Sequence, residues 1–261
     1  MKTTAERSSE HDPSIKPIYY QHLSVYEYAS RLTQGKTVLD IGCGEGYGTA
    51  LLARSAKKAV GVDYSGQAIQ RCRALYPQPN IEFVRADIGS FEYNASFDVV
   101  CAFQFVEHLR DPGVLLSKVC RLLSPEGIFL LSTPNRRASL VKHPYHFREY
   151  TKEELHSLLK EYFNRVDIRG LEFSEKVARF REERRGESQK LLRLDPLGIH
   201  MLIPLGMRRK LFDLIAARLS SRIHARNAGL TASINTSDYR VAEAFNDTAI
   251  DLVALCSAPA S

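Results

Sequence analysis

TVLDIGCGEGYGTALLA, residues 37–53, is the stretch that decides the fold of this chain. A short apolar run reaches Asp40, glycines alternate at positions 42, 44, 46 and 48, and apolar residues at helical spacing follow. Glycine has no Cβ atom, so it suits a turn in which the backbone bends sharply or approaches a ligand closely. The stretch therefore predicts a strand, a ligand-cradling turn and a helix N-terminus.

The glycine turn departs from the dinucleotide-binding fingerprint, which requires a third glycine five positions after the first. That position holds Tyr47. The sequence DIGCGEG, which starts at Asp40, instead resembles motif I of the class I S-adenosylmethionine (SAM) methyltransferases. The resemblance implies that Gly42 and Gly44 line the cofactor and that Asp40 helps to hold its amino end. A plain tight turn in an α/β domain is the alternative.

Length and composition are those of a soluble globular protein, with 261 residues, 44% hydrophobic and 25% charged. No apolar run approaches the roughly 20 residues of a membrane span, and the polar start MKTTAERSSEHDPS lacks the apolar core of a signal peptide. We therefore expect a cytoplasmic protein. The 5 cysteines show no CxxC pair and no zinc-like clustering, which predicts free thiols.

The positive charge is concentrated in one segment. Residues 173–226 carry 13 Lys and Arg against 6 Asp and Glu, a net of +7, so the remainder of the +6 chain nets −1. Within this segment, FREERRGESQK predicts a solvated helical face, and GMRRKLFDLIAARLSSRI predicts an amphipathic helix with Leu211, Leu214, Ile215 and Leu219 on its apolar stripe. Such a helix would pack against the core, although a lid, a dimer contact, a membrane surface or the reception of a phosphorylated or nucleotide-linked acceptor would also suit it.

Apolar runs and helical patterns alternate along the rest of the chain in the order that a doubly wound sheet requires. Strands are predicted over 59–62, 81–85, 97–103, 128–133, 165–172 and 249–256, in addition to the first, and the family resemblance implies that the last closes the sheet edge in an antiparallel hairpin. The predicted fold is an α/β, Rossmann-like, seven-stranded doubly wound sheet. We divide it into a disordered tail (1–18), a SAM-binding core (19–172), a basic, mainly helical insertion (173–247), and the last strand with the C-terminal tail (248–261).

Ligands of such sheets bind beyond the carboxyl ends of the strands. Asp63 ends the second strand, where a carboxylate can accept both ribose hydroxyls of an adenosine; a helix N-terminal charge is the alternative. The resemblance further implies that Asp87 contacts the adenine amino group, although an Asx turn would also explain it. The residues expected at the cofactor are Asp40, Gly42, Cys43, Gly44, Tyr47, Asp63, Tyr64, Asp87, Ile88 and Phe103, together with Tyr20 and His22 from a helix predicted over 19–32 and across the glycine turn.

Two places offer a base for the acceptor. QFVEHL contains Glu107 and His108 just after the fourth strand, where an ion pair of Glu107 with Arg110 or a buried hydrogen bond is the structural alternative. The loop NRRASLVKHPYHFREYT contains His143 and His146, and its second half is similar to a segment that borders the acceptor pocket in envelope-glycan and small-molecule methyltransferases. A neutral imidazole, with an ordinary pKa of about 6.5, suits a base at cytoplasmic pH. A structural aromatic loop, with Arg148 and Glu149 paired locally and the histidines merely hydrogen-bonded, is the alternative.

The same side chains, Glu107, His108 and either loop histidine, could also hold a divalent ion that activates a hydroxyl. They come from separate loops without diagnostic spacing, so no metal is expected.

The sequence therefore predicts a SAM-dependent methyltransferase of the ubiquinone-type or envelope-glycan-like branch, acting on a hydroxyl of a sugar, glycolipid or secondary metabolite. The catalytic candidates are His146, His143, Glu107 and His108, and the transfer would be an in-line displacement with a His or Glu base. Small-molecule N-methylation, nucleic-acid methylation and non-catalytic SAM binding are alternatives. Nucleic acid is a weak candidate partner, because QFVEH occupies the place of the Asn/Asp-Pro-Pro-aromatic stretch of base-methylating families. The expected partner is a small-molecule acceptor, with membrane-surface contact and a homodimer as further options.

Overall fold

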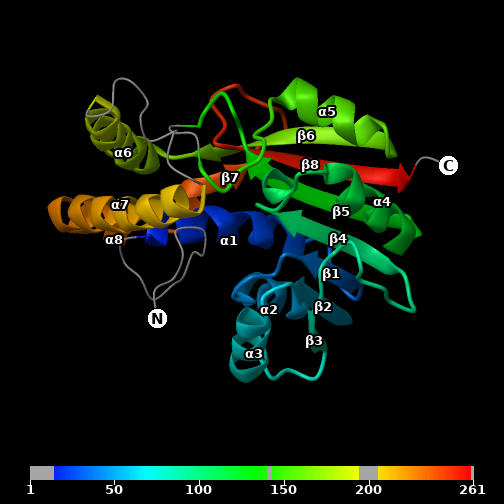
Figure 1. Cartoon of the computed structure of the whole chain (residues 1–261). Coiled ribbons are helices and arrows are strands. Elements are labelled where there is room, and N and C mark those ends of the chain that lie inside the picture. The colour runs from blue at the N-terminus through cyan, green and yellow to red at the C-terminus, as the bar shows by residue number, and fades with distance from the viewer. Residues whose placement is uncertain (1–14, 140–142, 194–204, 260–261) are drawn as a thin grey trace.

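The computed structural model describes residues 15–139, 143–193 and 205–259, which build one mixed α/β layer structure (Figure 1). Helix α1 begins at Lys16 and carries Pro17 in its first turn, where a missing N–H costs nothing. The tail predicted over residues 1–18 was therefore too long by its last residues. Its first 14 positions lie outside the described residues.

The described strands form one sheet with the order β3-β2-β1-β4-β5-β8-β6-β7. Strands β3, β2, β1, β4 and β5 are parallel, whereas β8 runs antiparallel between β5 and β6. The antiparallel pairing of the last strand is thus confirmed, but its predicted place at the sheet edge is wrong, since β8 is an inner strand and β7 forms that edge in the described part of the chain. The bounds are β1 Thr37–Ile41, β2 Lys58–Asp63, β3 Ile81–Arg85, β4 Phe97–Phe103, β5 Leu123–Pro134, β6 Phe163–Phe173, β7 Tyr239–Val241 and β8 Asp251–Pro259.

The sheet has 8 strands in the described part of the chain, and the prediction of seven was wrong by one. The extra strand is β7, which lies inside the insertion and pairs with the end of β6 through Leu171, Glu172 and Phe173. Three residues are too few for an alternating apolar pattern to reveal a strand.

Helices cover both faces of the sheet. They are α1 Lys16–Ser30, α2 Tyr47–Ala53, α3 Gly66–Leu75, α4 Pro112–Leu122, α5 Lys152–Lys160, α6 Glu175–Arg193, α7 Leu205–Arg226 and α8 Ala228–Ser233, with 3-10 turns η1 Val106–His108 and η3 Thr236–Asp238. The predicted capping box is present at α5, because Thr151 and Glu154 each accept from the other's backbone N–H. No helix among the described residues is both long and apolar enough to cross a membrane.

Central strand β4 shows why the core has two halves. Val100 and Ala102 belong to one buried cluster and Val99, Cys101 and Phe103 to the other, since successive side chains of a strand point to opposite faces. Both faces are covered, as the continuous apolar run predicts. The cysteines are free thiols, in agreement with their spacing.

The helices of the insertion gather beyond the edge at which the parallel strands end. In Figure 1, α6, α7 and α8 lie with α1 on the side toward which β4 and β5 point, and away from the end of β8. Of the apolar stripe predicted on α7, Leu219 packs against the core, while Leu214 remains 40% exposed. The insertion therefore stands where a doubly wound sheet presents its ligands.

Candidate active site

The glycine turn contains two kinds of glycine. Gly42, Gly44 and Gly46 all have positive φ angles, which L side chains adopt at a cost. A Cβ atom on Gly46 would stand 2.7 Å from the Cys72 sulfur, so this glycine is required for packing inside the protein. A Cβ atom on Gly44 would meet nothing nearer than 3.9 Å. Gly44 therefore faces open space, as a ligand-lining position would.

Asp40 is fully buried at the centre of the sheet and is held by protein groups. Its carboxylate accepts from Thr49 Oγ1 at 2.6 Å and from Tyr26 Oη at 3.1 and 3.3 Å. Burial raises the pKa of Asp40 to about 7, although both hydrogen bonds act in the opposite direction. Asp40 thus fixes α1 and α2 to the glycine turn, and its predicted contact with the cofactor amino end stays a prediction.

The acids at the next two strand ends differ in their surroundings. Asp63 accepts from the Gly44 N–H at 3.1 Å and from the Ser65 N–H at 2.8 Å, so it ties the glycine turn to the start of α3. Asp87 is exposed and accepts from the Gly89 N–H at 2.8 Å, which is the Asx turn foreseen as its alternative. Tyr64 is 73% exposed beside Asp63, whereas Ile88 is buried in the core. Adenosine recognition by these residues remains predicted.

Helix α1 lies across the glycine turn as expected. Tyr47, which replaces the third glycine, meets the ring of Tyr19 at 4.9 Å and that of Tyr26 at 5.8 Å. Tyr20 packs on Tyr19 in the same aromatic group, and burial lowers the pKa of His22 to about 4, which keeps its imidazole neutral. These contacts place the predicted α1 residues beside the turn.

The turn and the end of β4 are in direct contact. A Cβ atom on Gly42 would lie 2.4 Å from the Phe105 ring, so only glycine fits beneath that ring. Phe103 is buried against Tyr26 at 4.8 Å, and the thiol of Cys43 is also buried, where a hydrogen bond with Cys72 and burial raise its pKa. These two expected cofactor residues are hence packed among protein groups. Phe105 was not predicted, and it joins the glycine turn to Glu107.

A cavity of ≈ 210 Å³ lies beyond the ends of β4 and β5. Its wall combines α1, the loop after β5, α6 and the start of β8, through His143, His146, Arg181 and Asp251 among others. A hollow of ≈ 630 Å³ exists between the start of β5, β6 and the end of β8. That hollow lies at the amino ends of the parallel strands, the wrong edge for ligands of this fold. We therefore take the smaller cavity as the candidate ligand site.

Glu107 is fully buried beside the cavity loop and is incompletely satisfied. One oxygen accepts from Thr133 Oγ1 at 2.9 Å, and the other, Oε1, has no hydrogen-bond partner among the described residues. Burial raises the pKa of Glu107 to about 7, and nearby His146 opposes this shift. Of the two structural alternatives for Glu107, the buried hydrogen bond is present, with Thr133, whereas the ion pair with Arg110 is wrong, since that guanidinium lies on the Phe147 ring at 4.9 Å.

The three candidate histidines come together in space. The rings of His143 and His146 stack at 4.4 Å, and His108 meets His146 edge-on at 5.0 Å. His146 Nδ1 lies 2.7 Å from Glu149 Oε1, and Arg148 lies 3.6 Å from Glu154. The structural alternative is therefore right that a loop histidine is hydrogen-bonded, and Arg148 and Glu149 pair with these groups and not with each other. Since a carboxylate can only accept, Nδ1 donates and Nε2 is the nitrogen able to accept a proton. Burial, then His146, His108 and Arg184, lower the pKa of His143 to about 3.

A metal ion could use part of this cluster. Glu107, His108 and His146 each offer a ligand atom, and these atoms lie within 4.8 Å of one another. Ligands of one bound transition-metal ion at metal distances of about 2.1 Å stand only about 3.0 to 3.5 Å apart. The three side chains would have to draw together to hold an ion.

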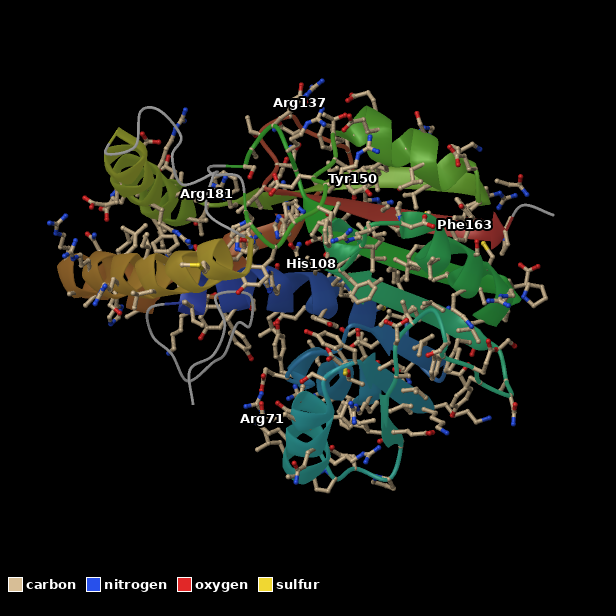
Figure 2. The ribbon with its side chains drawn as sticks, viewed as in Figure 1. Arg71, His108, Arg137, Tyr150, Phe163 and Arg181 are labelled. Carbon is tan, nitrogen blue, oxygen red and sulfur yellow. The ribbon has the colours of Figure 1, made fainter. Side chains whose placement is uncertain are left out.

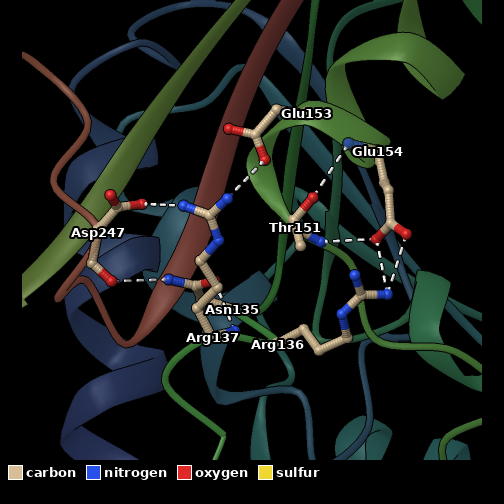
Figure 3. A network of polar contacts seen from close by, with 7 residues as sticks. All are labelled: Asn135, Arg136, Arg137, Thr151, Glu153, Glu154 and Asp247. Carbon is tan, nitrogen blue, oxygen red and sulfur yellow. Dashed lines mark hydrogen bonds and ion pairs between the residues drawn. The ribbon is translucent and has the colours of Figure 1, made fainter.

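The loop that carries the histidines is fastened at both ends (Figure 3). Asn135, buried at the exit of β5, donates to the Ala249 carbonyl at 2.8 Å, while Arg136 pairs with Glu154 at 2.9 Å. Arg137 pairs with Asp247 at 2.7 Å. These contacts connect the start of the loop to α5 and to the segment before β8.

Several cavity residues were not predicted. Gln104 adopts a φ of 50° directly after β4, a strained conformation for a residue other than glycine. Arg181 and Arg184 belong to the segment FREERRGESQK, and the prediction that this face is solvated was wrong for both (Figure 2 labels Arg181). Asp251 interrupts the apolar run AIDLVALC, and that interruption was an available signal. Gln104 gave none.

Comparison with known proteins agrees with this geometry. A family model described as a methyltransferase domain matches residues 32–182, which is more than half of the chain. A probable SAM-dependent methyltransferase of Mycolicibacterium smegmatis is 37% identical over 148 residues, 54% of this chain and 57% of the relative. A ubiquinone biosynthesis O-methyltransferase of Pseudoalteromonas translucida is 28% identical over 139 residues, 51% and 59% of the two chains.

Among solved structures, a SAM-dependent methyltransferase of Thermotoga maritima, described as a possible histamine N-methyltransferase, superposes with a TM-score of 0.59. The match covers 93% of this chain and 91% of that chain at 13% identity, so it shows a shared fold. The matched region spans only a little over half the length of the two curated relatives, 57% and 59%. By its family model and its sheet, the chain belongs to the methyltransferase-domain family, on the class I fold of the SAM-dependent methyltransferases.

Proposed function

We propose that this protein is a SAM-dependent methyltransferase that methylates a hydroxyl group of a small molecule bound in the ≈ 210 Å³ cavity. One observation carries the proposal. The hydrogen-bonded pair of His146 and Glu149 lines a cavity at the carboxyl edge of the sheet, next to the loop that contacts the glycine turn.

The residues at the first strand ends fit the cofactor. Gly44 leaves open space at the turn, and Asp63 stands at the end of β2 as an acceptor-only group suited to ribose hydroxyls. Bound SAM would supply an electrophilic methyl group on a sulfonium with a good leaving group. The protein then has to align acceptor and donor and to exclude water.

A hydroxyl acceptor is favoured by the state of the histidines. Glu149 holds the Nδ1 proton of His146, so Nε2 can take the hydroxyl proton as oxygen attacks the methyl group. The carboxylate also stabilises the imidazolium that forms, in the manner of a base oriented by a third group. An amine acceptor that arrives neutral needs no such base at the moment of attack.

The relatives support methyl transfer generally and differ in the acceptor atom that their descriptions give. One is described as an O-methyltransferase and one as a possible N-methyltransferase. The choice of oxygen therefore rests on His146 and Glu149.

The test has two stages. Calorimetry of the full chain with S-adenosylhomocysteine measures donor binding, and Asp63→Asn is expected to weaken it by about 10-fold or more, because a charged acceptor is lost. Release of S-adenosylhomocysteine is then measured against matched hydroxyl and amine acceptors. Turnover of amines alone, or no donor binding by the wild-type chain, overturns the proposal.

A further inference from the structure

Two arginines of the insertion stand in the wall of the acceptor cavity. Arg181 and Arg184 lie three residues apart on α6 and both line the cavity, while Val177 and Phe180 of the same helix are buried in the core. The helix is therefore docked by its apolar residues and delivers both guanidinium groups to the place where the acceptor would bind.

The two arginines differ in how their charges are compensated. Arg181 donates to the Ala138 carbonyl at 2.8 Å and is attracted by Asp251. Arg184 has no carboxylate within ion-pair distance among the described residues. Its guanidinium carbon lies 5.8 Å from the centre of the Phe180 ring. A cation–π contact at that distance contributes about 0.5 to 1 kcal/mol and leaves the charge in place.

The acidic groups of the cavity are already engaged elsewhere. Glu149 is hydrogen-bonded to His146, and Asp251 accepts from Gln21 Nε2 at 2.8 Å. Burial lowers the pKa of Arg184, and the positive charge of Arg181 acts in the same direction. A partly buried cation without a counter-charge is costly, and an anion that binds beside it removes that cost.

We propose that Arg184, assisted by Arg181, forms an anion-binding subsite in the acceptor cavity, so that the acceptor carries a carboxylate or phosphate group as well as its hydroxyl. Arg184 lies close enough to His143 to affect its titration, and the His143 ring stacks on His146 at 4.4 Å. Arg184, His143 and His146 line the same cavity, so one acceptor could present its anionic group to Arg184 and its hydroxyl to His146. This substrate class rests on the proposed function, whereas anion binding itself does not.

The first experiment measures anion binding without turnover. The full chain, with S-adenosylhomocysteine present, is heated in inorganic phosphate, in acetate and in chloride at equal ionic strength. At least one of the two test anions is expected to raise Tm above its value in chloride. Arg184→Gln should lose this rise, and Arg184→Lys should keep part of it. Arg185→Gln is the matched control, because Arg185 is the next residue of α6 and is exposed.

The subsite is overturned if neither anion raises the Tm of the wild-type chain, or if Arg184→Gln shows the same rise in Tm as the wild-type chain. The comparison of phosphate with acetate shows which anion the subsite prefers. Far-ultraviolet circular dichroism establishes that each variant is folded before its Tm shift is interpreted.

The second experiment compares matched acceptors, namely catechol with 3,4-dihydroxybenzoate and glucose with glucose 6-phosphate. We expect the anionic member of a pair to show a kcat/KM about tenfold higher or more, and Arg184→Gln to remove that preference mainly through KM. Turnover of the neutral members alone overturns the subsite and leaves methyl transfer standing. A chain that binds phosphate through Arg184 but binds no S-adenosylhomocysteine overturns the proposed function and leaves the subsite standing.

Discussion

The donor side and the acceptor side of this molecule are built on opposite plans. On the donor side, the ends of β1 and β2 present backbone turns and carboxylates whose partners lie within the same supersecondary units, such as Asp63 with the Gly44 N–H. On the acceptor side, Glu107, His146 and Arg184 come from distant segments, and two of them retain a polar atom or a charge without a partner among the described residues. The difference is one of distance along the chain, because the donor side is built from neighbouring segments and the proposed acceptor side is assembled from remote ones.

The largest effect is expected from His146→Gln, which removes the proposed base from the acceptor side. We expect kcat to fall by about 10² to 10⁴, while the affinity for S-adenosylhomocysteine changes less than twofold. Stopped assays with an active acceptor and calorimetry measure the two quantities. Glu149→Gln should cost less, since the imidazole remains. An equal loss of donor affinity would show that the two sides are not separate.

Two glycine substitutions should divide the donor side into ligand-facing and packing positions. Gly48→Ala places a Cβ atom 2.1 Å from the Tyr26 ring and should lower the free energy of unfolding by about 3 kcal/mol. Gly44→Ala meets no neighbour and should lower it by only about 1 to 2 kcal/mol through its positive φ. Urea denaturation measures both. If the folded Gly44→Ala variant binds S-adenosylhomocysteine as tightly as wild type does, the open space at Gly44 is not a ligand-lining position.

The buried acid on the donor side predicts a pH dependence. Since burial raises the pKa of Asp40 from 3.8 to about 7, the folded state holds a proton that the unfolded chain releases at lower pH. This contribution to stability is complete below pH 3.8 and is lost as the pH rises through about 7.

The Asp40→Asn variant has no carboxyl proton to lose, so this pH-dependent loss of stability affects the wild-type chain alone. The free energy of unfolding of the variant minus that of wild type should therefore increase between pH 5 and pH 8, by at most about 3 kcal/mol. Unfolding curves of both proteins at the two pH values give this difference. A difference independent of pH would mean that Asp40 stays ionised when folded. Thr49→Val provides a comparison in which the acid keeps its burial but loses one donor.

The smallest effect is expected from chelation. If His146 is a base, dialysis against EDTA should change turnover by less than twofold, and added Zn²⁺ should inhibit by occupying the imidazole nitrogen. Metal content before and after dialysis is the accompanying measurement. Loss of activity that Zn²⁺ or Mn²⁺ restores would instead assign Glu107, His108 and His146 as ligands.

The sequence by itself determined the α/β fold and most strand positions, and it predicted residues for the donor side. Strand β4 was located to the residue, because a buried parallel strand is a continuous apolar run. Glycine spacing and acids at strand ends are local signals, and the sheet brings them together by its topology alone. Strand β7 was not predicted, because its three residues are too few to show an alternating pattern of apolar and polar side chains.

Only the tertiary structure decided the acceptor side. Arg184 has the local pattern of a solvated helical residue, and it becomes a cavity residue only because Val177 and Phe180 dock α6 onto the core. In the same way, His146, Arg181 and Asp251 come from three distant segments and line one cavity only in the folded chain. Contacts between segments far apart in the chain carry no periodicity, so their partners are set by packing. This is the physical reason that the donor could be recognised from a motif and the acceptor could not.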